Sequence, residues 1–379
     1  MAFEEYVYSG TQRLRRGYTT GTCATLAAKA AATMLLSGEA PCEIEIMTPA
    51  QVSVCVEPML VESDKRHATF AVIKDAGDDY DVTDGIEVRC TVSLIDFGVE
   101  IDGGDGVGRV TAKGLDQPVG NAAINSGPRA MIAQVLQEVS AEYGYQAGLK
   151  AVVEVAGGEE IAKKTFNSSI GIMGGISILG TSGIVEPQSL QALKDALEVE
   201  VKFQAAQGAK HLIVTPGNYG EAFLPSLGLP SDLPTVKCAN FIGDTLDFAV
   251  REGFEQILLV GHIGKLVKVA GNIMDTHSRM ADCRREIFAA HAAYCGASQH
   301  AIAEIFDAMT TDACLEILDV EGLRQPVLER IAGAIQEAIQ KRVGEDAQAG
   351  AVIYSNQTGL LAMTDAATQI IDTWKVSEQ

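Results

Sequence analysis

Apolar and polar residues alternate along much of the first half of the chain. An apolar side chain at every second position is the period of a strand with one face buried. We therefore expect strands at EIEIM (43–47), VSVCVEP (52–58), ATFAVIKD (68–75), IEVRCTVSLIDF (86–97) and AVVEVA (151–156). A helix precedes them in TCATLAAKAAATMLLSG, which Thr22 would cap and Gly38 would close. A second helix runs from about Ser126 to about Tyr143, with Pro128 in its first turn.

The pattern changes after Pro187, where long helical segments alternate with short, wholly apolar ones. The apolar segments are HLIVT (211–215), QILLVG (256–261) and AVIYS (351–355). Apolar strands between helices are typical of a parallel sheet covered on both faces. We predict an N-terminal mixed α+β domain (1–185) followed by a C-terminal α/β domain (186–379) whose sheet is largely parallel and Rossmann-like.

The charge balance limits the partners. Asp and Glu number 50 against 29 Lys and Arg, which gives a formal net charge of -21. Such a surface repels phosphate backbones, so we expect no nucleic-acid partner. Neither a basic start with an apolar stretch behind it nor a run of about 18 apolar residues occurs, so we expect a cytoplasmic protein without a membrane segment.

A basic lead precedes the first helix. Arg13, Arg15 and Arg16 stand before Gly17-Tyr-Thr-Thr-Gly-Thr22. Hydroxyls and free N–H groups at a helix N-terminus attract anions, so this segment indicates either an anionic small-molecule ligand or an ordinary hydroxyl-rich cap.

An acidic turn lies between two of the expected strands, with carboxylates at residues 75, 78, 79, 81 and 84. An EF-hand needs Gly at its sixth position and Glu at its twelfth, and a loop that starts at Asp79 has Asp84 and Cys90 there. Two interpretations remain. The carboxylates form a solvated turn, or they face a site where crowding supplies a base.

Two glycine-rich segments follow. GGDGVGR (103–109) contains GxGxG without an obvious following helix, and we expect a tight loop. GIMGGISILGTSG (171–183) interleaves glycine with apolar residues, which suits a strand pressed against another backbone or against a flat ligand.

The strongest positional signal lies in the second half, where two glycine loops directly follow apolar strands. Ligands of open α/β sheets bind at the carboxyl ends of strands. Neither loop has the Walker A or GxGxxG spacing, so ATP and NAD are not indicated. The candidate binding residues are Gly217, Asn218, Gly220, Gly261, His262, Gly264 and Lys265.

Histidine and cysteine recur between residues 277 and 300. His291 and Cys295 are four apart and could share a metal, but their Ala-rich surroundings indicate helix packing, and we predict no protein-bound metal. His277 has polar neighbours and is a candidate for a ligand contact.

Taken in order, RRGYTTGTCATLAAKAA, DAGDDYDVTDG, GGDGVGRVT, SSIGIMGGISILGTSGIVEP, TPGNYG and VGHIGKLVKVAGNIMDTHSRMAD resemble the cobalt-precorrin-5B C(1)-methyltransferases of anaerobic cobalamin biosynthesis. The acidic turn departs from that pattern at Tyr80 and Asp84, where Pro and His are expected. The resemblance implies S-adenosylmethionine as methyl donor and an anionic, cobalt-bearing tetrapyrrole as acceptor.

On this resemblance the C-terminal loops would bind the donor and the N-terminal domain would present the macrocycle. Asp78 and His277 are the candidates for moving protons. The residues expected to meet the acceptor's carboxylates are Arg13, Arg15, Arg16, Thr19, Thr20, Gly21, Thr22 and Lys29. Two other classes stay open: a small-molecule kinase or ligase that uses the glycine loops for phosphates, and a non-catalytic carrier of tetrapyrrole or cobalt. A homo-oligomer is left open as well.

Overall fold

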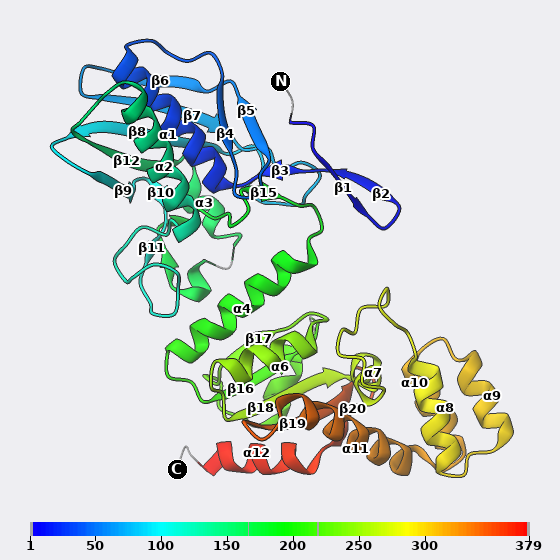
Figure 1. The fold of residues 1–379 in the computed structure, drawn as a ribbon. Coiled ribbons are helices and arrows are strands. Elements are labelled where there is room, and N and C mark those ends of the chain that lie inside the picture. The colour runs from blue at the N-terminus through cyan, green and yellow to red at the C-terminus, as the bar shows by residue number, and fades with distance from the viewer. Residues whose placement is uncertain (1–2, 166, 218–219, 377–379) are drawn as a thin grey trace. The chain divides into compact units, whose positions relative to one another are not determined.

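The computed structural model describes residues 3–165, 167–217 and 220–376. The chain forms two compact units, residues 1–190 and 191–379 (Figure 1). Of the described helices, none combines the length and apolar character that crossing a membrane requires.

Unit 1 is built on a five-stranded sheet in the order β6-β7-β8-β12-β9. Its strands are β6 (Met59–Ser63), β7 (His67–Ile73), β8 (Glu87–Ile95), β12 (Gly148–Val155) and β9 (Val99–Gly103). Neighbours are antiparallel except β9 and β12, which run parallel. The carboxyl ends of β9 and β12 therefore lie at the same edge of the sheet.

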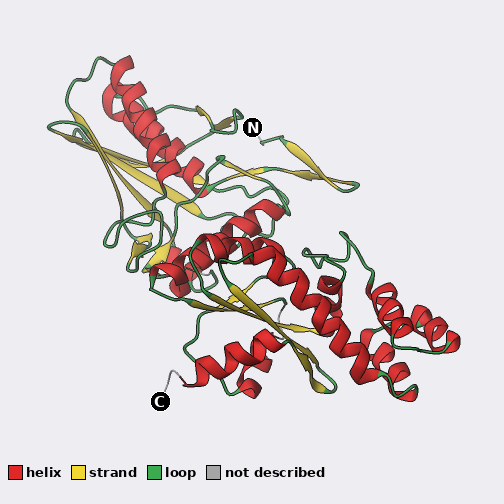
Figure 2. Ribbon diagram, turned by 60° about the horizontal axis from the view of Figure 1, so that its bottom comes forward, coloured by secondary structure: helices red, strands yellow, loops and turns green. Residues whose placement is uncertain are grey.

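Two helices, α1 (Thr20–Ser37) and α2 (Ser126–Glu142), cover one face of this sheet (Figures 1 and 2). Alanines fill the buried face of α1, and their small side chains let the helix approach the strands closely. The predicted close at Gly38 is confirmed, with a left-handed φ of 82°. The predicted cap at Thr22 is wrong. Thr19 is the cap, and its hydroxyl accepts a hydrogen bond from the Thr22 N–H.

Short paired strands surround the sheet, and they include most of the glycine-rich sequence. The remaining elements of unit 1 are β1 (Tyr6–Ser9), β2 (Gln12–Arg15), β3 (Gly17–Tyr18), β4 (Ile44–Met47), β5 (Ser53–Val56), β10 (Gly106–Val107), β11 (Arg109–Val110), α3 (Gly158–Ala162), η1 (Ser168–Ile170), β13 (Ile172–Met173), β14 (Gly175–Ile176) and β15 (Ile184–Val185). Residues 103–109, expected as a plain loop, instead contain the end of β9, all of β10 and the start of β11, because β14 and β13 supply pairing partners from far along the chain.

Three glycines bring these short strands together. A Cβ on Gly106 would lie 2.0 Å from the Val155 carbonyl oxygen, and one on Gly158 or Gly175 would lie 2.2 or 2.3 Å from the Gly106 oxygen. Of the two interpretations of residues 171–183, the backbone contact is what the structure shows at Gly175.

Unit 2 is built on a five-stranded sheet in the order β17-β16-β18-β19-β20. The strands are β16 (His211–Thr215), β17 (Thr235–Lys237), β18 (Gln256–His262), β19 (Gln348–Ser355) and β20 (Gly359–Met363). The first four are mutually parallel and β20 is antiparallel at the edge. The three predicted strands are confirmed as β16, β18 and β19. The sequence pattern missed β17 and β20, because one is only three residues long and the other is largely half-exposed.

Both faces of this sheet are covered, so its strands are apolar throughout. Alternate residues of β18 enter different cores: Ile257 and Leu259 pack with one helix layer, whereas Leu258 and Val260 pack with Trp374 of α12. The helices are α4 (Leu190–Ala206), α5 (Gly220–Phe223), η2 (Leu224–Leu227), α6 (Ile242–Arg251), α7 (Ile263–Ala270), α8 (Arg284–Tyr294), α9 (Gln299–Asp307), α10 (Thr311–Val320), α11 (Arg324–Val343) and α12 (Asp365–Val376). Figure 1 shows α6, α7 and α11 on one face and α12 on the other.

The contact at Gly106 makes a stability prediction with an internal control. Gly98 has nearly the same backbone conformation (φ 77° against 75°), but a Cβ there would meet nothing within 4 Å. We expect Gly98→Ala to cost about 1–2 kcal/mol of unfolding free energy from backbone strain alone. Gly106→Ala should cost at least about 3 kcal/mol, because the methyl group also collides with the β12 backbone. Hydrogen exchange of β9 and β12 amides measures the difference, and equal losses in the two variants would contradict the packing argument.

Candidate functional site

The start of α1 is held by a segment about 160 residues away. The N–H of Gly21 donates to the Leu179 carbonyl at 2.8 Å, and the Thr22 hydroxyl donates to the Gly183 carbonyl at 2.6 Å. The Thr20 hydroxyl accepts from the Leu179 N–H at 2.9 Å. These groups, predicted to meet an anion, already have protein partners. Their role in substrate binding stays a prediction, and their structural role is plain.

The arginines of the basic lead also have partners within unit 1. Arg15 forms a two-pronged ion pair with Asp75, at 2.5 and 2.7 Å. Arg16 pairs with Glu186 at 2.6 Å. Asp78, the predicted proton carrier, is exposed and accepts a hydrogen bond from the Arg15 backbone N–H at 2.6 Å. The structure thus joins the basic lead to the acidic turn, two motifs that the sequence analysis treated separately.

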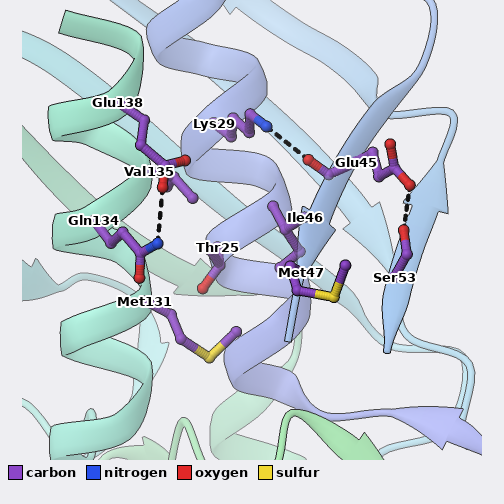
Figure 3. A pocket seen from close by; sticks show the side chains of 10 residues that line it. All are labelled: Thr25, Lys29, Glu45, Ile46, Met47, Ser53, Met131, Gln134, Val135 and Glu138. Carbon is purple, nitrogen blue, oxygen red and sulfur yellow. Dashed lines mark hydrogen bonds between the residues drawn. The ribbon is translucent and has the colours of Figure 1, made fainter. Parts of the chain in front are cut away.

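Lys29 lies apart from this group. It follows Thr19 by ten residues along α1, which corresponds to about 15 Å of helix. Its ammonium donates to the Glu45 carbonyl at 2.7 Å, in a small cavity of about 270 Å³ between α1, α2 and β4 (Figure 3). Lys29 and the arginines therefore lie at different points along unit 1, and the role of Lys29 in substrate binding stays a prediction.

The acidic turn is stabilised by its own carboxylates. Asp81 pairs with the ammonium of Lys74, which is 2 % exposed, at 2.7 Å, and Asp84 accepts from the Ala76 N–H at 2.8 Å. The Arg15 guanidinium holds the pKa of Asp75 below its ordinary value. Of the two interpretations, a turn ordered by its carboxylates fits these contacts best.

At the carboxyl edge of the unit 2 sheet, the structure brings the predicted glycine loops together. β16 and β18 are neighbours, so the loops after Thr215 and after His262 lie side by side. A Cβ on Gly217 would lie 3.4 Å from the Lys265 ammonium, and one on Gly261 would lie 2.9 Å from Pro216 of the other loop. Gly220 packs on Thr215. Asn218 lies outside the described residues.

Lys265 is the centre of this edge. Its ammonium donates to the Ala239 carbonyl at 2.8 Å and to the Asn240 side-chain oxygen at 2.7 Å, and burial lowers its pKa. Within the part of the chain that the structure describes, no carboxylate lies within ion-pair distance of it. The sequence analysis missed Asn240, because its loop follows the three-residue strand β17 and carries no distinctive motif.

His277 joins the same edge through its neighbour. Thr276 donates its backbone N–H to the Asn240 carbonyl at 2.9 Å, and the His277 ring accepts from the Arg279 N–H at 3.0 Å. Of the two predicted proton carriers, His277 thus belongs to unit 2 and Asp78 to unit 1.

His262 and Lys268 complete the α7 region. The His262 ring accepts from the Gly264 N–H at 3.0 Å and caps α7, and burial lowers its pKa. Lys268 is 3 % exposed, and its ammonium donates to the carbonyls of Thr276 and Ala281. The ammonium groups of Lys265 and Lys268 therefore both belong to α7 in an otherwise acidic chain.

Glu200 of α4 is a further group that sequence reasoning missed. Burial and the neighbouring Glu221 raise its pKa to about 7, while Lys237 at the end of β17 opposes the shift. No local motif marks it, because its surroundings come from three separate elements.

Unit 1 contains a larger cavity, of about 850 Å³, which the sequence did not predict. It opens at the carboxyl ends of β9 and β12. Its lining is Arg89, Gly103, Gly104, Asp105, Gly106, Val107, Arg109, Glu154, Val155, Ala156, Gly157, Gly158, Glu159, Glu160, Met173 and Gly174. The sequence feature that marks this cavity is the GxGxG spacing of 104–108. Because no helix is expected after it, this spacing does not by itself predict a binding site.

Among the described residues, no group of three or more His, Cys, Asp or Glu side chains is arranged to hold a metal ion.

Comparison with known proteins decides the family. Residues 7–187 match the family description CbiD, and residues 275–365 match CbiD, C-terminal domain. The chain belongs to the CbiD family. The resemblance inferred from six sequence motifs is thereby confirmed.

Curated members of the CbiD family match almost the whole chain. The cobalt-precorrin-5B C(1)-methyltransferase of Ruminiclostridium cellulolyticum is 47% identical over 93% of this chain and 92% of its own length. That of Alkaliphilus metalliredigens is 41% identical over 98% of each. A crystal structure of the cobalamin biosynthesis protein CbiD from Archaeoglobus fulgidus is 30% identical, covers 74% of this chain and 87% of that chain, and has a TM-score of 0.40.

The Arg15–Asp75 pair makes a pH-dependent stability prediction for this CbiD-family protein. Because the pKa of Asp75 is lowered in the folded state, its stabilisation is present above the unfolded pKa of about 3.9 and is lost as the pH falls through the folded value. We expect Asp75→Asn to lower the unfolding free energy by about 1–2 kcal/mol at pH 7, with the gap to wild type closing below about pH 4. Urea unfolding followed by circular dichroism measures it.

Asp96→Asn is the matched control, since the exposed side chain of Asp96 forms no hydrogen bond or ion pair with another described residue. A gap that stays constant with pH, or equals that of the control, would contradict a structural role for the pair.

Proposed function

We propose that this protein transfers the methyl group of S-adenosylmethionine to carbon 1 of the ring-contracted corrinoid cobalt-precorrin-5B, giving cobalt-precorrin-6A in anaerobic cobalamin biosynthesis. The observation that carries the proposal is the end-to-end match to relatives of that name, at 39–47% identity in the examples from Ruminiclostridium, Alkaliphilus metalliredigens and Listeria. Strands β16–β19 of unit 2 are parallel and helices cover both faces of their sheet, which supports the classification of unit 2 as Rossmann-like.

The reaction asks little covalent chemistry of the protein. The bond from the methyl carbon to the sulfonium sulfur breaks, its electron pair stays on sulfur, and an electron pair of the conjugated macrocycle forms the new carbon–carbon bond. Holding the two reactants in line supplies about 7–11 kcal/mol in favourable cases. The protein's main task is therefore to bind and orient two charged molecules.

We propose that the carboxyl edge of the unit 2 sheet binds a carboxylate at Lys265. A half-buried ammonium with only carbonyl and amide-oxygen partners is stabilised by an anion, and Gly217 leaves the approach free of a side chain. Both reactants carry carboxylates. The donor, which the sequence predicts at this edge, has one on its amino-acid end, and the macrocycle has several on its rim.

The reaction itself is tested by anaerobic incubation with methyl-labelled S-adenosylmethionine and cobalt-precorrin-5B. We expect the label at carbon 1, located by NMR, with no transfer when the acceptor is left out. ATP-dependent phosphoryl transfer in its place would support the kinase interpretation. Cobalt retained in stoichiometric amount without methyl transfer would support the carrier interpretation.

The carboxylate site is tested by Lys265→Met. Loss of a charged hydrogen bond should weaken the ligand concerned by about tenfold in calorimetry. Donor and macrocycle are titrated separately, which shows whose carboxylate Lys265 holds. Lys237→Met is the control, because Lys237 ends β17 at the same edge of the sheet but is paired with Glu221 at 2.7 Å. Unchanged affinity for both ligands would remove Lys265 from the site.

A further inference from the structure

The GxGxG segment of unit 1 forms the wall of a cavity whose volume suits a small molecule. At about 850 Å³, it lies within the 300–1,000 Å³ typical of ligand pockets. It opens where the one parallel strand pair of the sheet ends, and the carboxyl ends of parallel strands are where ligands of such sheets gather.

Glycine makes much of its lining. Gly106 and Gly158 are required by close backbone packing, as described above. Gly157 and Gly174 have left-handed φ values of 69° and 81°, and a Cβ on either would meet nothing within 4 Å. At these two positions the backbone borders open space, so a ligand can approach it directly.

The cationic side chains of the lining are already neutralised. Arg109 donates to both oxygens of Asp102, at 2.7 and 3.1 Å, and to the Gly103 carbonyl at 2.6 Å. Arg89 pairs with Glu87 on its own strand. Neither arginine therefore offers the cavity a free positive charge.

The anionic side chains, in contrast, are largely uncompensated. The carboxylates of Asp105, Glu154 and Glu159 form no hydrogen bond or ion pair with any other residue that the structure describes. Glu154 is half-buried and lies against Gly104, where a Cβ would come within 2.8 Å of one of its oxygens. The cavity thus has a strongly negative lining that favours a cation and disfavours a polycarboxylate.

We infer that this cavity is the binding site of the methyl donor, with Glu154 and Asp105 facing its sulfonium. The inference rests on the proposed function. S-adenosylmethionine carries a sulfonium and an ammonium against one carboxylate, so it is a net cation. S-adenosylhomocysteine has lost the sulfonium charge, and the lining therefore also selects the donor over its spent form.

This placement differs from the one predicted from sequence, in which the donor binds at the edge of the unit 2 sheet. The physical reason is charge. The unit 2 edge presents an ammonium without a carboxylate partner among the described residues, whereas the unit 1 cavity presents carboxylates without cationic partners. With the donor in unit 1, the carboxylate at Lys265 belongs to the macrocycle.

The test compares the affinities of donor and product in variants of the full-length protein. We expect Glu154→Gln and Asp105→Asn each to weaken S-adenosylmethionine about fivefold in calorimetry, while S-adenosylhomocysteine changes less than about twofold. The effect should shrink in high salt, because the two carboxylates are partly open to solvent. Both substitutions keep side-chain size and remove no hydrogen bond or ion pair with a described residue, so the folded state should persist, which circular dichroism checks.

Glu100→Gln is the control for net charge. Glu100 lies on β9 outside the cavity lining and pairs with Lys150 at 3.8 Å, so its substitution removes the same charge without altering the cavity. Equal effects of all three variants, or equal loss of donor and product, would overturn the inference. Donor binding abolished by Lys265→Met and untouched by the cavity variants would place the donor in unit 2. A wild-type protein that binds no S-adenosylmethionine would instead contradict the proposed function itself.

Discussion

The architecture of unit 1 depends on a close crossing of three backbone segments that are far apart in sequence. A Cβ on Gly17 would lie 2.3 Å from the carbonyl carbon of Ala76, and one on Gly180 would lie 2.2 Å from the Thr19 hydroxyl. A Cβ on Gly77 would come equally close to the Arg15 carbonyl oxygen. These contacts exclude side chains, so the lead into α1, the acidic turn and the 179–183 segment can meet only through glycine. The position of α1 on the sheet follows from that meeting.

The crossing also decides which charges remain available for ligands. Arg15 and Arg16 are used to hold the segments together, and each forms an ion pair with a carboxylate from another segment. In a protein with a net charge of -21, cationic side chains are few, and those in such pairs are not free to bind an anionic ligand. Charged side chains that have no ion-pair partner therefore indicate where a ligand binds. A partly buried unpaired charge costs free energy, and a ligand of opposite charge offsets that cost.

Periodicity predicted the elements well because it reports burial, which is a local property of the chain. The alternation in β8 and the apolar runs of β16, β18 and β19 all reflect which faces are covered. The same reasoning failed for the partners of charged residues. Arg15 and Asp75 are 60 positions apart and Arg16 and Glu186 are 170 apart, and no local pattern reveals such a pair. The basic cluster in the sequence predicts an anion site, whereas in the fold Arg15 and Arg16 each pair with a carboxylate, so the binding role of the cluster stays a prediction.

Under the proposed assignment, the donor and the acceptor bind at sites of opposite charge, and this difference favours release of the spent donor after methyl transfer. The negative cavity holds the donor more strongly while its sulfur is positive, and transfer removes that charge from the sulfur in the same step that forms the new bond. The attraction between Glu154, Asp105 and the ligand then falls, since a neutral thioether gains nothing from nearby carboxylates. The acceptor keeps all its carboxylates and hence its attraction to Lys265. Under the proposed assignment, the spent donor therefore leaves more readily than the donor that it replaces, and no conformational switch is needed to favour its exchange.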